Sequence, residues 1–285
     1  MDMEELRGMP VVNAIADDVR KRMEALAAKD IVPTLAVIRV GEREDDLSYE
    51  RGLIKRFGSV GAGVVSKVLP VDVAEDELAA TIEACNKDNN IHGILIFRPL
   101  PRHINEKKII ELVDARKDVD CMTLINMAHT FAQDKEGHEP CTAQAVMEML
   151  DYYKVDLTGK NVVVVGRSMV VGKPLSVMLQ KKNATVTMCH TKTVDLPSIC
   201  RNADIICACA GSAGMIKKEY LSEGQIVMDV GINVVDGKLT GDVDYEAASE
   251  IVKAATPVPG GVGTVTTSVL LLHTLRSAEE SVTEA

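Results

Sequence analysis

The chain has 285 residues, of which 46% are hydrophobic and 26% charged, so it has enough core for one large or two ordinary globular domains. Its formal net charge of -10 argues against nucleic acid as the main partner, because binding to phosphate backbones needs a basic surface. No apolar run approaches the roughly 20 residues that cross a membrane, and the acidic first residues lack the pattern of a secretory signal.

The first half of the chain alternates between helix and strand patterns. The expected helices cover residues 11–28, 45–57, 75–86 and 106–113, and the expected strands cover residues 34–41, 64–70 and 93–97. Such alternation implies parallel strands joined by right-handed crossovers. The charged stretch 117–140, which contains Gly137 and Pro140, is expected to be a loop between two domains.

A second alternating series follows this loop. We expect a helix at 142–153, strands at 162–165, 184–189, 204–210 and 225–231, and an apolar helix that runs to about residue 277. The predicted fold is therefore a two-domain α/β protein, with a Rossmann-type parallel sheet in the second domain.

The seven cysteines are odd in number and scattered, and none forms a C-x-x-C pair. This usage predicts neither a disulfide framework nor a metal site. We therefore expect a cytoplasmic protein with reduced thiols and without a membrane partner.

The most informative segment is the β-branched run 162–165, which ends at Gly166-Arg167-Ser168 just before a helical pattern. A buried parallel strand that leads through such a turn into a helix places free N–H groups and the helix dipole next to a bound phosphate. A strand-to-helix turn that binds no ligand is the alternative.

The next strand helps to choose the ligand. In NAD-binding folds an acidic residue near its end accepts from the ribose 2′-hydroxyl, whereas this chain has His190-Thr191-Lys192 there. An acid would repel a 2′-phosphate, and Arg167 offers charge-assisted hydrogen bonds to one. The sequence therefore predicts NADP rather than NAD.

Five strings together resemble one family, the methylenetetrahydrofolate dehydrogenase/cyclohydrolases, over roughly residues 10–275. They are Gly166-Arg167-Ser168 with Val171-Gly172-Lys173-Pro174, Asp229-Val230-Gly231-Ile232-Asn233, residues 256–263, Lys117-Asp118-Val119-Asp120 and Pro140-Cys141-Thr142. The resemblance implies a homodimer with two domains in each subunit. The folate-binding catalytic domain is expected at 1–138, with the final helix (about 264–285) packing back on it, and the NADP-binding domain is expected at 139–263. Such enzymes oxidise 5,10-methylenetetrahydrofolate to the 5,10-methenyl cation with NADP, and most then hydrolyse that cation to 10-formyltetrahydrofolate.

The resemblance also implies roles for individual residues. On the cofactor side, the residues implied are Gly166, Arg167 and Ser168 at the phosphates, Thr191 near the 2′-phosphate and Ile232 beside the nicotinamide. On the folate side, they are Asp120 on the pterin N–H donors, Tyr49 stacked on the aminobenzoate ring, and Pro259, Gly260 and Gly261 bringing backbone close to the substrate. Tyr49 and Asp120 are the two candidate catalytic residues. An ordinary half-buried tyrosine and a capping carboxylate are the alternatives for them.

The chain departs from the family pattern at two catalytic positions. Leu53 stands where the family's Tyr-x-x-x-Lys helix carries lysine, and Phe97 stands where a glutamine is usual. Lys55 lies about 120° around the helix from Tyr49 and is not expected to replace the missing amine. Hydride transfer depends mainly on orientation, whereas hydrolysis needs acid–base groups, so we expect weak or absent cyclohydrolase activity. A fully bifunctional enzyme, an NADP oxidoreductase with an altered substrate, and a catalytically silent binding subunit remain as alternatives.

Overall fold

The computed structural model describes residues 3–134 and 136–283, which form two compact units. Unit 1 combines the described residues through Asn13 with Thr142–Thr266. Unit 2 combines Ala14–Cys141 with the described residues from Thr267 onwards. Each unit therefore contains one long and one short piece of the chain.

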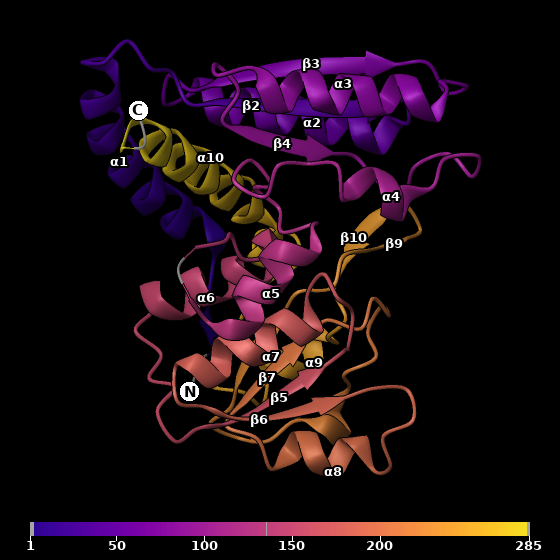
Figure 1. Cartoon of the computed structure of the whole chain (residues 1–285). Coiled ribbons are helices and arrows are strands. Elements are labelled where there is room, and N and C mark those ends of the chain that lie inside the picture. The colour runs from indigo at the N-terminus through magenta and orange to yellow at the C-terminus, as the bar shows by residue number, and fades with distance from the viewer. Residues whose placement is uncertain (1–2, 135, 284–285) are drawn as a thin grey trace. The chain divides into compact units, whose positions relative to one another are not determined.

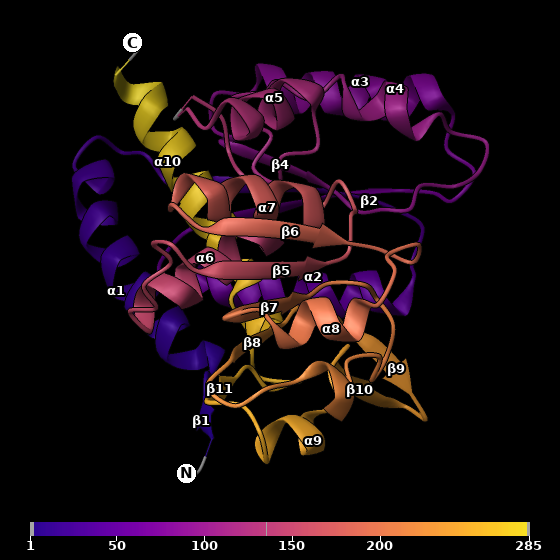
Figure 2. The same ribbon diagram turned by 90° about the horizontal axis from the view of Figure 1, so that it is seen from below.

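Unit 1 is built on a six-stranded parallel sheet in the order β1-β11-β8-β7-β5-β6, of which Figure 2 shows the successive strands β6, β5, β7 and β8. The strands are β1 (Glu4–Glu5), β5 (Asn161–Val165), β6 (Thr185–Cys189), β7 (Ile205–Ala208), β8 (Ile226–Asp229) and β11 (Ala254–Ala255). The helices of this part of the chain are α6 (Cys141–Tyr152), α7 (Gly172–Lys181), α8 (Leu196–Arg201) and α9 (Tyr245–Ser249). Two 3₁₀ turns cover Lys218–Tyr220 and Val262–Thr264. The β-branched residues of β5 and β7 are buried, because a parallel sheet is covered on both faces.

Unit 2 contains a three-stranded parallel sheet in which β2 (Thr34–Val40) lies between β3 (Gly63–Leu69) and β4 (Gly93–Ile96), as Figure 1 shows. Its helices are α1 (Gly8–Ala27, which begins in unit 1), α2 (Glu44–Gly58), α3 (Glu75–Lys87), α4 (Glu106–Ile110), α5 (Leu124–Ala132) and α10 (Thr266–Thr283). The ring of His273 on α10 hydrogen-bonds the carbonyl of Val119 at 2.8 Å, and Arg22 on α1 pairs with Glu279 at 2.6 Å. The last helix is therefore part of the packing of unit 2.

The expected α/β class and the parallel sheets are confirmed, but several short elements were not predicted, among them β1, β11, α8 and α9. The stretch expected to be a loop contains α5, which Thr123 caps by accepting a hydrogen bond from the N–H of Asn126. Leu124, Met127, Ala128 and Phe131 do form an apolar stripe at helical spacing, but it lies on the exposed face of α5, where Leu124 is 65% and Phe131 77% exposed. A hairpin of β9 (Asn233–Val235) and β10 (Lys238–Thr240) was not predicted either, and its Asp236-Gly237 turn has positive φ at both residues.

Candidate functional site

The cofactor candidates of unit 1 lie at the carboxyl edge of its sheet. Gly166 follows β5 directly and has a φ of +138°, and a Cβ there would overlap the carbonyl oxygen of Cys209. A Cβ on Gly172, the first residue of α7, would likewise overlap the carbonyl of Gly166. The turn therefore requires glycine at both positions, and it brings backbone close to the beginning of a ten-residue helix.

The remaining residues of this turn lie beside the end of the neighbouring strand. The Ser168 hydroxyl accepts a hydrogen bond from the N–H of Val171 at 3.1 Å, which orders the entry to α7. The N–H of Gly166 donates to the carbonyl of Cys189, the last residue of β6, so Thr191 follows at the same edge. Arg167 and Thr191 are both exposed. The structure thus brings together Gly166, Arg167, Ser168 and Thr191, and these residues fit a phosphorylated dinucleotide.

Ile232 and the glycine-rich segment 259–263 form a second group in unit 1. Ile232 follows β8, is 60% exposed, and lies against Gly263, where a Cβ would be 2.9 Å from the Ile232 Cδ1 atom. The Val258–Pro259 peptide is cis, Gly260 has a φ of +106°, and its carbonyl accepts from the N–H of Gly8 at 2.8 Å. The Gly8 N–H thus anchors the backbone at Gly260, and the exposed Ile232 side chain lies beside this segment.

Two of the folate candidates, Tyr49 and Asp120, belong to unit 2. Tyr49 on α2 is 38% exposed, and its ring centroid lies 5.7 Å from that of Phe97 at an interplanar angle of 54°. Leu53, one helical turn further, is fully buried, whereas Lys55 is exposed on another side of the continuous helix. Gly52 therefore causes no rearrangement of α2, and Lys55 does not occupy the position of the missing amine.

Asp120 and its neighbour Asp118 play different parts. The Asp118 carboxylate is fully buried and accepts hydrogen bonds from the backbone of Met122 and Thr123, at 2.9 and 2.8 Å, and from the Thr123 hydroxyl. It fixes the backbone that carries Asp120. The pKa of Asp120 is raised to about 6, mainly because the carboxyl group is buried. The Asp118 carboxylate also raises this pKa, whereas a hydrogen bond from Cys141 and the Arg98 guanidinium lower it. Asp120 is thus a carboxyl group that changes charge close to neutral pH.

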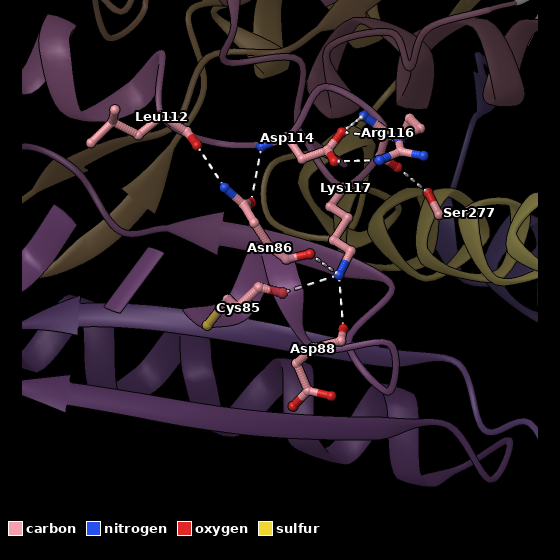
Figure 3. A network of polar contacts seen from close by, with 8 residues as sticks. All are labelled: Cys85, Asn86, Asp88, Leu112, Asp114, Arg116, Lys117 and Ser277. Atoms are coloured by element: carbon pink, nitrogen blue, oxygen red, sulfur yellow. Dashed lines mark hydrogen bonds and ion pairs between the residues drawn. The ribbon is translucent and has the colours of Figure 1, made fainter. Parts of the chain in front are cut away.

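The start of the Lys117–Asp120 motif is also anchored, as Figure 3 shows. The Lys117 ammonium donates to three backbone carbonyls at the C-terminus of α3: those of Cys85 at 3.0 Å and of Asn86 and Asp88 at 2.8 Å. These carbonyls have no partner within an α-helix, so a cation there is favoured by hydrogen bonding and by the helix dipole. Lys117 therefore acts as a structural cap of α3.

Among residues 3–134 and 136–283, no group of three or more His, Cys, Asp and Glu side chains is arranged to hold a metal ion. In the same described ranges, no helix has the length and apolar character of a membrane span.

Comparison with known proteins identifies the family. Residues 6–120 match the catalytic domain of tetrahydrofolate dehydrogenase/cyclohydrolase, and residues 140–282 match its NAD(P)-binding domain. The chain belongs to this family. It is 48% identical over 277 residues to the bifunctional protein FolD of Clostridium botulinum (strain Langeland), covering 97% of this chain and 98% of the relative. Identity to FolD of Carboxydothermus hydrogenoformans is 47% over 279 residues, covering 97% of each.

Solved structures of family members agree with this assignment. The bifunctional dehydrogenase/cyclohydrolase FolD of Campylobacter jejuni superposes with a TM-score of 0.95 at 38% identity, covering 98% of this chain and 99% of the other. The dehydrogenase-cyclohydrolase of Trypanosoma brucei, solved in complex with NADP cofactor and an inhibitor, has a TM-score of 0.93 at 33% identity and covers 99% of each chain. The family resemblance inferred from the five strings is therefore confirmed.

Proposed function

We propose that this protein is an NADP-dependent methylenetetrahydrofolate dehydrogenase whose cyclohydrolase activity is weak or absent. Bound NADP supplies a hydride acceptor, so that the methylene carbon of the substrate loses a hydride and becomes the 5,10-methenyl cation. The family assignment and the glycine-dependent turn at the end of β5 support the first part. The replacement of two polar catalytic groups by Leu53 and Phe97 supports the second.

The proposed cofactor contacts are assigned to unit 1. Gly166, Arg167 and Ser168 receive the phosphates, with Thr191 beside the 2′-phosphate, because no carboxylate stands at the end of β6 to repel that group. Ile232 provides an apolar surface for the nicotinamide. We assign NADP binding to residues 139–263 and folate binding to residues 1–138 together with the final helix (about 264–285).

The proposed folate contacts combine one carboxylate, one aromatic ring and a stretch of close backbone. Asp120 accepts hydrogen bonds from the pterin N–H donors, and Tyr49 stacks on the aminobenzoate ring. The segment Pro259-Gly260-Gly261 contacts the substrate through its backbone, since glycine has no Cβ to keep the ligand away. All of these contacts bind and orient the substrate, which is what hydride transfer requires.

The observation that carries the loss of hydrolysis is the surroundings of Tyr49. Hydrolysis of the methenyl cation requires a water to be activated and protons to be moved as the tetrahedral intermediate collapses, which is acid–base work. At the two positions concerned, the chain presents the fully buried Leu53 and the Phe97 ring packed against Tyr49. Neither side chain exchanges protons or forms a strong hydrogen bond.

The test is an anaerobic assay with 5,10-methylenetetrahydrofolate and NADP that follows NADPH and methenyltetrahydrofolate separately, with a correction for spontaneous hydrolysis. We expect NADPH to form while methenyltetrahydrofolate accumulates. Enzymatic loss of the methenyl compound as fast as NADPH appears would show a fully bifunctional enzyme. An absence of NADPH formation would indicate a changed substrate or a silent binding subunit.

A pair of variants tests the assignment of Leu53 and Phe97 directly. The double variant Leu53→Lys with Phe97→Gln restores the polar groups and should raise the hydrolysis rate at least tenfold, since acid–base groups typically contribute roughly 10²–10⁴-fold. The matched control, Leu53→Met with Phe97→Gln, changes the packing similarly but supplies no amine. Equal hydrolysis by both variants would mean that the missing lysine is not the cause.

Two further properties are proposed. We infer a homodimer from the family resemblance, to be checked by light scattering at several protein concentrations. We also infer a cytoplasmic location, which the seven free cysteines support because thiols stay reduced there. Fractionation of cells of the source organism would test it.

A further inference from the structure

Two buried carboxylates of unit 1 lie outside the contacts assigned so far. Asp242 follows the β9–β10 hairpin and is fully buried, and Asp229 is the last residue of β8 and is 2% exposed. Carboxylates are rarely buried unless their oxygens accept hydrogen bonds, so the groups that contact them show what they hold in place.

The Asp242 carboxylate joins two loops. Its Oδ2 atom accepts from the N–H groups of Ala210 at 2.6 Å and Gly211 at 2.8 Å. Its Oδ1 atom accepts from the N–H of Ser212 at 2.7 Å and from the side-chain amide of Asn233 at 3.0 Å. The first three donors follow β7 and the fourth follows β8, and these two strands are paired neighbours.

Asp229 holds Asp242 in turn. Its carboxylate accepts from the backbone N–H groups of Asp242 at 2.9 Å, Val243 at 3.0 Å and Gly231 at 3.2 Å. A Cβ on Gly231 would overlap the Asp242 carboxylate, and one on Gly241 would overlap that of Asp229. The two acids therefore form one close-packed arrangement, in which neither Gly231 nor Gly241 has room for a side chain.

The strand order tells which part of a dinucleotide these loops face. Strand order reverses between β5 and β7, and a dinucleotide crosses the sheet edge at such a point. The β5 and β6 ends belong to the adenosine half, which carries the 2′-phosphate, so the β7 and β8 ends belong to the nicotinamide half. Ile232 lies in the β8 loop, directly before Asn233.

We propose that Asp242 is a positioning residue for the nicotinamide half of NADP, holding the loops after β7 and β8 in the arrangement that hydride transfer needs. The inference rests on the proposed NADP-dependent dehydrogenase activity and deepens it. Asp242 contacts no reacting atom; it acts through the backbone of residues 210–212 and through Asn233.

The test compares how the protein binds NADP with how it binds adenosine 2′,5′-bisphosphate, a fragment that lacks the nicotinamide half. In Asp242→Asn, either orientation of the amide keeps only two of the four accepted hydrogen bonds. We expect the Kd and KM for NADP to rise about tenfold and kcat to fall about tenfold. The Kd for adenosine 2′,5′-bisphosphate, measured by calorimetry, should stay within about twofold because this fragment contacts only the β5 and β6 ends.

Two further variants keep the test decisive. Asp244→Asn is the matched control, since the Asp244 carboxylate caps α9 by accepting from the N–H of Ala247, and all parameters should stay at wild-type values. Asn233→Ala removes one donor to Asp242 and should show the same pattern with a smaller effect; it carries the test alone if Asp242→Asn does not fold.

The proposal would be overturned if Asp242→Asn weakened the binding of NADP and of the bisphosphate equally, or did not weaken NADP binding. The carboxylates would then be purely structural. The binding measurements need no folate. A wild-type protein that binds NADP but does not oxidise methylenetetrahydrofolate would therefore refute the proposed activity while leaving this test valid.

Discussion

Asp120 allows a quantitative prediction for substrate binding. Its carboxylate is the form that accepts the pterin N–H donors, and burial raises its pKa to about 6. With that pKa, about 97% of the groups are ionised at pH 7.5 and about 9% at pH 5. The kcat/KM for methylenetetrahydrofolate, measured at saturating NADP, should therefore fall roughly tenfold between these two pH values.

Asp120→Asn is the matching perturbation. It removes the negative charge and one acceptor oxygen, and hydrogen bonds to charged groups contribute about 1.5–3 kcal/mol each. We expect kcat/KM to decrease by at least about tenfold at pH 7.5. Because an amide does not titrate, the remaining activity should also lose the tenfold dependence on pH between 5 and 7.5.

Initial rates of NADPH formation across this pH range provide the assay. Asp88→Asn is the control, because the Asp88 carboxylate accepts from Asn90 on the surface of the same unit and should leave the profile unchanged. A pH profile that Asp120→Asn shares with the wild type would refute the reasoning, since another group would then be responsible for the decrease.

Two further predictions concern the stability of unit 2. Burial lowers the pKa of His138 to about 2 and that of His273 to about 4, so both stacked rings are neutral in the folded protein. In the unfolded chain both rings take up a proton below about pH 6.5. The stability that these neutral rings contribute is therefore complete above about pH 6.5 and is lost as the pH falls below it. Between pH 7 and pH 4.5 the free energy of unfolding of the wild type should thus decrease by about 2–3 kcal/mol more than that of His138→Gln, as urea titrations will show; equal decreases would contradict the assignment. Lys117→Met leaves three carbonyls at the end of α3 without their cation and should lower the free energy of unfolding by about 2–3 kcal/mol. The exposed control Lys87→Met should change it by less than about 0.5 kcal/mol, and similar values for both lysines would show that the cap is unimportant.

The strands and helices with strong periodicity could be predicted because their pattern reports burial. The β-branched run of β5 and the turn at Gly166 are examples: the first must be covered on both faces, and the second needs a residue without a Cβ. No local pattern marked Leu53 and Phe97: the family resemblance alone implied that they stand at catalytic positions on α2 and after β4, and the structure shows both side chains buried.

Other features depend on contacts between distant residues and have no local signal. The two-residue strand Glu4–Glu5 has no apolar pattern and exists only because its backbone pairs with β11. Asp242 reads as an ordinary loop acid, since its donors at residues 210–212 lie about 30 positions earlier in the chain. The only local hint is a pair of nearby glycines. Gly231, two residues after Asp229, leaves room for the Asp242 carboxylate, and Gly241, directly before Asp242, leaves room for the Asp229 carboxylate.

The division of each unit into two pieces of the chain has a consequence for biosynthesis. Unit 1 needs β1 to pair with the edge of β11, and unit 2 needs α10, which is synthesised after the other helices and strands of that unit. Domains commonly fold during synthesis from the N-terminal end, but here the earlier half waits for the final helix. Until then the apolar groups that α10 covers remain open to chaperones, and the edge of β11 lacks protection if the first residues are trimmed. Loss of β1 or of α10 is therefore expected to reduce the yield of folded protein.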